Sequence, residues 1–148
     1  MKLTAFTDYS LRVLIYLATQ PGRRARVAEV ARAFEVPENH LVKVVHFLGK
    51  SGWLRNVRGN GGGMELASAP ESIRVGSVIR ATEGDALMAE CFGDSTSTCC
   101  IAPACRLRGV FSEALTGFYS VLDRYTLADL VTNRQELVKI LFVERVKT

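Results

Sequence analysis

The fold is decided by the stretch Val27-Ala28-Glu29-Val30-Ala31-Arg32-Ala33-Phe34-Glu35-Val36-Pro37-Glu38-Asn39-His40-Leu41-Val42-Lys43-Val44-Val45-His46-Phe47-Leu48. Apolar residues recur at helical spacing over residues 27–34 and again over 41–48, so each run predicts a short amphipathic helix. Only residues 35–37 separate the two runs, and Pro37 suits the first helical position because its missing N–H costs nothing there. Polar residues open the second helix. The stretch therefore predicts a helix-turn-helix.

A β-hairpin is predicted directly after these helices. Residues 53–58 and 64–66 have strand character, and Gly59-Asn60-Gly61-Gly62-Gly63 between them tolerates positive φ. A phosphate-cradling loop is the alternative for these glycines, but no Lys-Ser/Thr pair follows them and no βαβ unit surrounds them. A helix-turn-helix followed by a hairpin is a winged helix.

The remaining elements are helical. Thr4 can cap a first helix that Pro21-Gly22 ends, and a fourth helix is expected over 75–82. A long helix should start at about Pro103, because apolar residues then follow a three–four spacing that favours pairing with a second copy, although a core-facing helix is the alternative. These residues are Ala104, Leu107, Phe111, Ala114, Phe118, Val121 and Tyr125. Thr126 to Asp129 form a capping box before a short last helix.

The predicted fold is thus mainly α with a small β-hairpin wing: a winged helix-turn-helix plus a long dimerisation helix. We expect a winged-helix domain over residues 1–83, whose first helix also packs on the dimer core. A cysteine-bearing loop should follow over 84–105, and the dimerisation helix and helical tail over 106–148. The 148 residues, 48% of them hydrophobic, suffice to bury such a core.

Charge is distributed unevenly along the chain. Residues 1–80 hold 12 Lys and Arg against 6 Asp and Glu, whereas residues 81–148 hold 7 against 9. A basic half is typical of proteins that bind a polyanion, nucleic acid first, with a merely basic surface as the alternative. No apolar run approaches the ~20 residues of a membrane span, and the N-terminus lacks the features of a secretory signal. The sequence therefore predicts a cytoplasmic protein.

All four cysteines of the chain lie within fifteen residues: Cys91, Cys99, Cys100 and Cys105. In a reducing cytoplasm, thiols gathered in this way indicate a metal or iron–sulfur site. Adjacent Cys99 and Cys100 point in different directions, so three cysteine ligands and one spare thiol are expected. Because iron–sulfur clusters usually have four protein ligands, a fourth ligand must come from elsewhere.

Other interpretations of the cysteines carry less weight. Zinc sites usually pair cysteines two to four residues apart, often with histidines, and His40 and His46 are far from these cysteines in sequence. A zinc-stabilised DNA-binding protein remains an alternative, and so does a redox protein, although the winged helix argues against the latter. No catalytic triad, paired-carboxylate cleft or nucleotide fingerprint is present, so an enzyme is not expected.

The sequence resembles the Rrf family of winged-helix regulators, and within it the branch that senses nitric oxide. The resemblance rests on five stretches: Leu3 to Arg12, Asn39 to Lys43, Val57 to Gly62, Pro103 to Leu107 and Tyr125 to Leu130. The Arg-Gly-x-Gly-Gly wing and the three-cysteine loop are specific to the family, and the start of the chain through Asp8 points to the nitric-oxide branch.

The resemblance implies a homodimer that holds an iron–sulfur cluster, 4Fe-4S with 2Fe-2S as the alternative. Its ligands would be Cys91, Cys99 and Cys105 of one subunit and Asp8 of the other. Cys100 is the alternative to Cys99, which is preferred because it keeps the family's five-residue gap to Cys105. The gap from Cys91 to Cys99 is seven residues, longer than the family's common five. Without the resemblance, Asp8 would be taken as a carboxylate favoured by the helix dipole.

The function expected on this basis is a transcriptional repressor that releases its operator when nitric oxide attacks the cluster. A regulator that responds to iron or to cluster status is the alternative within the family. The dimer should bind pseudo-palindromic double-stranded DNA, with one recognition helix per major groove. Asn39, His40 and Lys43 on that helix are the candidate contacts, with Arg58 and Asn60 at the wing, where Arg58 suits a narrow minor groove.

Overall fold

The structure is a computed structural model that describes residues 2–84 and 99–142, and these residues are mainly helical. The helices are α1 (Ala5–Thr19), α2 (Val27–Phe34), α3 (Glu38–Lys50), α4 (Val75–Glu83), α5 (Arg106–Leu122) and α6 (Arg134–Leu141). One antiparallel hairpin is formed by β1 (Leu54–Val57) and β2 (Gly63–Leu66). Short 3-10 turns cover Pro70–Ser72, Ala102–Ala104 and Asp129–Val131.

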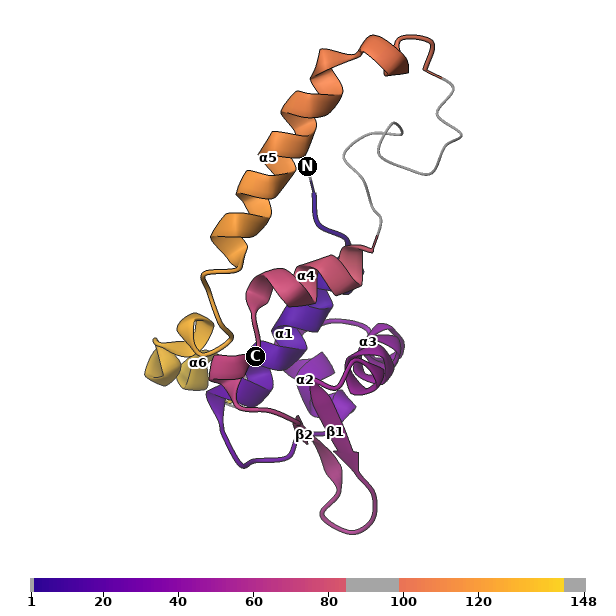
Figure 1. Cartoon of the computed structure of the whole chain (residues 1–148). Helices are drawn as coiled ribbons and strands as arrows, with labels where there is room; N and C mark the ends of the chain where they lie inside the picture. The colour runs from indigo at the N-terminus through magenta and orange to yellow at the C-terminus, as the bar shows by residue number, and fades with distance from the viewer. Residues whose placement is uncertain (1, 85–98, 143–148) are drawn as a thin grey trace.

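The chain divides in space into a body and an arm (Figure 1). The body consists of α1 to α4, the hairpin and α6, and the arm is α5 with the turn Ala102–Ala104 before it. The predicted winged helix-turn-helix is confirmed, since α2 and α3 are followed by the hairpin, which projects from the body as the wing. The division into domains at residues 84 and 105 stays a prediction.

Local sequence signals explain where the helices begin. Thr4 caps α1, and its hydroxyl accepts a hydrogen bond from the Thr7 N–H at 3.2 Å. Helix α2 has the predicted bounds, whereas α3 differs at its start. Pro37 has an extended ψ of 129°, so it is the N-cap of α3 and not its first helical residue. The predicted capping box is present, because Asp129 accepts from the Thr126 N–H at 2.7 Å, and it opens the 3-10 turn before α6.

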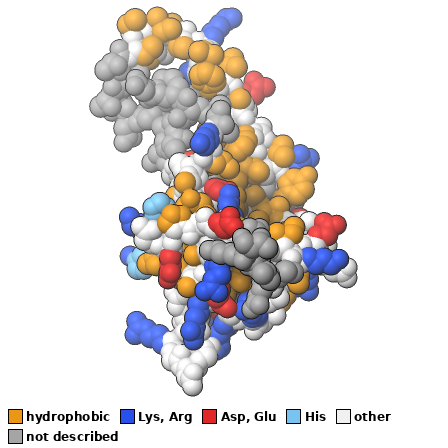
Figure 2. All heavy atoms as spheres, turned by 180° about the vertical axis from the view of Figure 1, so that it is seen from behind, with side chains coloured by type: hydrophobic (Ala, Val, Ile, Leu, Met, Phe, Trp, Pro, Cys, Tyr) orange, Lys and Arg blue, Asp and Glu red, His pale blue; other side chains and the backbone are white. Residues whose placement is uncertain are grey.

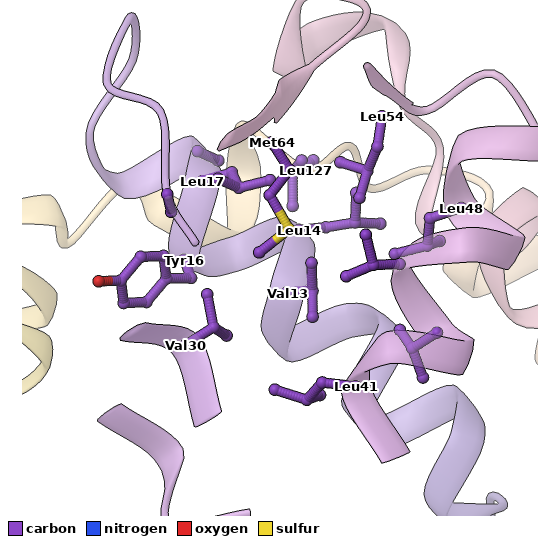
Figure 3. Packing of buried hydrophobic residues seen from close by; sticks show 14 of the residues in the cluster. Val13, Leu14, Tyr16, Leu17, Val30, Leu41, Leu48, Leu54, Met64 and Leu127 are labelled. Atoms are coloured by element: carbon purple, nitrogen blue, oxygen red, sulfur yellow. The ribbon is translucent and has the colours of Figure 1, made fainter. Parts of the chain in front are cut away.

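The core forms where α1 passes between the other elements of the body (Figure 3). Val13 and Leu14 of α1 are fully buried and meet the apolar faces of α2 and α3. The predicted inward residues of α3 are all buried, whereas in α2 Val30 and Ala31 are buried and Val27 and Phe34 are half-buried. Met64 contributes from the wing and Leu127 from beyond the arm. The chain therefore returns to the body after α5.

Three segments close the base of the wing. Strands β1 and β2 pair with Leu54 opposite Leu66 and Arg55 opposite Glu65. Ala25, in the connection before α2, forms a bridge with Met64 through two backbone hydrogen bonds of 3.0 and 2.8 Å. The bridge fixes the wing to the helix-turn-helix.

The arm joins the body at a polar junction. Backbone hydrogen bonds connect residues 73–75 to residues 125–127. The Arg80 guanidinium of α4 donates two hydrogen bonds, of 2.7 and 2.6 Å, to the Asp123 carboxylate at the end of α5, and it lies 4.2 Å from the Tyr119 ring centroid. Gly76 lies directly under Asp123, where a Cβ atom would overlap Asp123 Oδ1. These contacts set the direction in which α5 leaves the body.

The arm itself is covered little within one chain. Helix α5 has no buried residue, and Leu107 and Val121 of the predicted apolar stripe are 54% and 44% exposed. The helix begins at Arg106, later than the predicted start near Pro103, because Ala102–Ala104 forms a 3-10 turn.

Candidate nucleic-acid interface and cysteine site

The outer face of α3 carries the residues expected to contact DNA. Asn39, His40 and Lys43 are all exposed, whereas Leu41 and Val44 of the same helix are buried. This division follows from the helical period, which places apolar and polar residues on opposite faces. The structure thus brings three of the five predicted DNA contacts onto one accessible surface.

The other two predicted contacts lie at the wing. Arg58 and Asn60 are exposed in the loop between β1 and β2. Gly59 and Gly61, with φ of 97° and 75°, adopt the left-handed conformation that the turn requires. In Figure 2, Lys and Arg side chains gather on the body and toward the wing, while hydrophobic side chains dominate the arm. The basic half of the sequence therefore corresponds to the end of the molecule that carries α3 and the wing.

Asp8 lies in the first turn of α1 with its side chain 48% exposed. Its carboxylate forms an ion pair with Arg12 at 2.8 Å. The Arg12 guanidinium lies 5.9 Å from the centroid of the Tyr9 ring, and that ring stacks on His40 of α3 at 6.2 Å. Asp8 is thereby connected through side chains to a predicted DNA contact.

Arg12 and Tyr9 are residues that the sequence-based site did not include. The four-residue spacing of Asp8 and Arg12 was the available signal, because such pairs meet on one face of a helix. The contact between Tyr9 and His40, by contrast, depends on how α1 packs against α3.

The start of α1 is attached to the end of α4. The Thr4 N–H and hydroxyl both donate to Glu83, at 2.8 and 3.1 Å, and the Thr7 hydroxyl donates to that of Thr82 at 2.8 Å. Although burial raises the pKa of Glu83, hydrogen bonds from Thr7 and Thr4 outweigh it and hold that pKa below its ordinary value. A charged Glu83 thus anchors the turn that carries Asp8 next to residue 84, after which the cysteine-bearing segment begins.

Residues 99–105, which include Cys99, Cys100 and Cys105, lie at the end of the arm that is farther from the wing (Figure 1). Cys99 and Cys100 are exposed, and Cys105 is half-buried at the N-cap of α5. Cys91, the remaining predicted ligand, falls outside the described residues. Within residues 2–84 and 99–142, no three His, Cys, Asp or Glu side chains lie close enough to hold one metal ion. One chain therefore does not bring the described members of the predicted ligand set together.

The chemistry of the donor set nevertheless fits an iron–sulfur cluster. Thiolates are the usual ligands of such clusters, and Cys99, Cys105 and Asp8 all have side chains that solvent reaches.

None of the helices in the described part of the chain is both long and apolar enough to cross a membrane.

Comparison with known proteins identifies the family. The model of the Rrf2 family, described as an iron-dependent transcriptional regulator, matches residues 3–133. This chain belongs to the Rrf2 family. The HTH-type transcriptional regulator NsrR of Halalkalibacterium halodurans is 48% identical over 142 residues, which are 95% of this chain and 97% of that protein. NsrR of Bacillus subtilis is 46% identical with the same coverage.

Solved structures of the Rrf2 family have the same fold. The structure of IscR from T. potens superposes with a TM-score of 0.74 at 26% identity, covering 93% of this chain and 90% of that one. CymR, the global cysteine regulator of B. subtilis, gives a TM-score of 0.72 at 27% identity over 90% and 98%. The protein is therefore a DNA-binding transcriptional regulator with a winged-helix fold, and its relatives are regulators rather than enzymes.

Proposed function

We propose that this Rrf2 protein is a cytoplasmic repressor that senses nitric oxide and works as a homodimer. Cys91, Cys99 and Cys105 of one protomer, with Asp8 of the partner subunit, would hold an iron–sulfur cluster, 4Fe-4S in preference to 2Fe-2S. Such a cluster supplies iron that reacts with nitric oxide. In this ligand set the carboxylate of Asp8 would be a weaker and harder ligand for iron than a fourth thiolate.

The position of Asp8 is the observation that carries this proposal. Its carboxylate is accessible on α1, yet Arg12 and Tyr9 connect it to His40 at the start of α3. A change in what Asp8 binds would release or engage Arg12, and Arg12 packs beside the ring that supports His40. The same residue thus belongs both to the proposed ligand set and to the support of the DNA-binding helix.

A partner subunit would resolve two features of the single chain. The arm exposes its apolar stripe, with Leu107 and Val121 about half exposed, and a second arm would cover it. The described cysteines and Asp8 do not gather within one chain, so a ligand set shared between protomers fits better than one confined to a single chain. Two copies would also present two α3 helices to a pseudo-palindromic duplex.

The decisive experiment is purification without oxygen, followed by assays of iron and sulfide and addition of nitric oxide while DNA binding is monitored. We expect iron and sulfide in the protein and loss of DNA on addition of nitric oxide. A colourless protein with stoichiometric zinc would contradict the cluster. An iron–sulfur protein whose DNA binding follows iron supply and ignores nitric oxide would support the iron-responsive alternative.

Two adjacent thiols provide a matched pair for the ligand assignment. Cys99→Ser should lose iron and sulfide, whereas Cys100→Ser should retain both, because Cys100 is the spare thiol in the proposed set. The reverse result would exchange their roles.

Asp8→Asn should keep iron and sulfide but change the affinity for DNA. If both DNA binding and the nitric oxide response are unaltered in this variant, Asp8 does not couple the cluster to the DNA-binding helix.

A further inference from the structure

Two arginines share one carboxylate at the base of the wing. Glu65 of β2 accepts a hydrogen bond from Arg55 Nε at 2.9 Å and another from Arg24 Nε at 3.0 Å. Arg24 also extends to the wing loop, where its Nη1 lies 3.4 Å from the Gly61 carbonyl oxygen. This set, the wing triad, comes from three separate segments of the chain.

The backbone pairing explains why the three side chains meet. Arg55 and Glu65 are directly opposite in the hairpin, so their side chains lie on the same face. Met64, the neighbour of Glu65, points to the core, and Glu65 therefore points outward. The bridge between Ala25 and Met64 places Arg24 at the edge of the same outer face.

In the wing triad, the positively charged side chains are more exposed than the negatively charged one. Glu65 is only 16% exposed, whereas Arg24 and Arg55 are 43% and 68% exposed. Hydrogen bonds from Arg55 and then Arg24 hold the pKa of Glu65 below its ordinary value, so the carboxylate stays charged and keeps both guanidiniums in place. Within the described residues, Arg55 Nη1 and Arg24 Nη2 have no acceptor. The free N–H groups of two fixed guanidiniums suit a phosphate.

We propose that Arg24 and Arg55, held by Glu65, bind the DNA backbone beside the wing. The occupant is a DNA phosphate because the same hairpin carries exposed Arg58 and Asn60, and the family binds DNA. These contacts position the wing without reading sequence, as phosphate contacts generally do. The proposal rests on DNA binding alone and does not depend on a cluster or on nitric oxide.

The test measures how DNA affinity depends on salt for Arg24→Gln and Arg55→Gln. The probe is a fluorescent duplex selected from a randomised pool by the unaltered protein, with binding followed by anisotropy. The plot of log affinity against log salt has a negative slope, and each lost phosphate contact should reduce the magnitude of that slope by about 0.9. We expect that decrease for either variant, together with affinity that is several-fold weaker. Arg55→Lys should restore most of the slope, because the charge is kept.

Arg23→Gln is the matched control. Arg23 neighbours Arg24 and is 42% exposed, but its guanidinium binds Glu29 at 2.9 Å and lies over the Phe142 ring, away from the wing. It should leave the slope unchanged. If Arg24→Gln and Arg55→Gln leave the salt dependence as steep as Arg23→Gln does, the two arginines do not contact the DNA backbone and the proposal is wrong.

Discussion

The body and the arm of this protein differ in how far they bury their apolar residues. Val13, Leu14, Val30 and Leu48 of the body have no exposed surface, whereas none of the 17 residues of α5 is buried. The body completes its core within one chain, and the arm does not. The apolar stripe of α5 therefore lies on the surface of the single chain, and we propose that a second copy of this chain covers it.

The largest expected effect lies in the body. Leu14→Ala removes a fully buried side chain at the centre of the core, so it should lower the free energy of unfolding by about 2–5 kcal/mol. Urea denaturation measures this loss. Val42→Ala, on the 53% exposed position of α3, is the control and should cost less than about 0.5 kcal/mol. Equal costs would mean that the contrast between core and surface is wrong.

A substitution in the arm should change the self-association of the protein rather than the stability of the body. Leu107→Glu places a charge in the apolar stripe of α5, 54% exposed in one chain, and should weaken the dimer by about tenfold or more, roughly 1.4 kcal/mol. Sedimentation over a range of concentrations measures it. Ser112→Glu adds the same charge to an exposed position outside the stripe and should leave the dimer intact. If the dissociation constant of the dimer is unchanged by Leu107→Glu, α5 is not the interface.

The junction between the two regions can be tested by a double-mutant cycle. Gly76→Ala should destabilise the protein, because the new Cβ displaces Asp123 from Arg80. In an Asp123→Ala background the same change should be neutral or stabilising, since alanine favours a helix over glycine. We expect a coupling of about 1 kcal/mol between the two positions. Additive effects, measured by urea denaturation, would show that the contact does not form.

Sequence periodicity predicted what is local in this fold. The bounds of α2, the cap at Thr4, the inward residues of α3 and the hairpin were all recoverable, because each depends on neighbours within a few positions. The late start of α5 was missed, since the turn Ala102–Ala104 continues the same apolar spacing without being α-helical.

The contacts that build the candidate sites were largely beyond the sequence. Thr4 and Glu83 are 79 positions apart, Arg80 and Asp123 are 43 apart, and Arg24 and Glu65 are 41 apart. Such pairs arise only from tertiary packing, on which periodicity carries no information. The exposed residues Asn39, His40, Lys43 and Arg58 were predictable as a group, because the helix-turn-helix and wing patterns assign them to the outer surface.

The smallest expected effect is a pH dependence at the junction. Hydrogen bonds from Arg80 hold the pKa of Asp123 below its ordinary value. A carboxyl group whose pKa is lowered by folding stabilises the protein above its unfolded pKa of about 3.9, and this contribution disappears as the pH falls through the folded value. Asp123→Asn should therefore be less stable than the unaltered protein at neutral pH, and this difference in the free energy of unfolding should narrow below about pH 4.

Other carboxyl groups do not affect this difference, because those whose pKa values are also lowered titrate in both proteins; they are Glu65, Asp129 and Glu83. A difference that stays constant down to pH 3 in urea denaturation would mean that Arg80 does not hold Asp123 in solution. The arm would then be joined to the body by the other contacts of the junction, among them the backbone hydrogen bonds between residues 73–75 and 125–127.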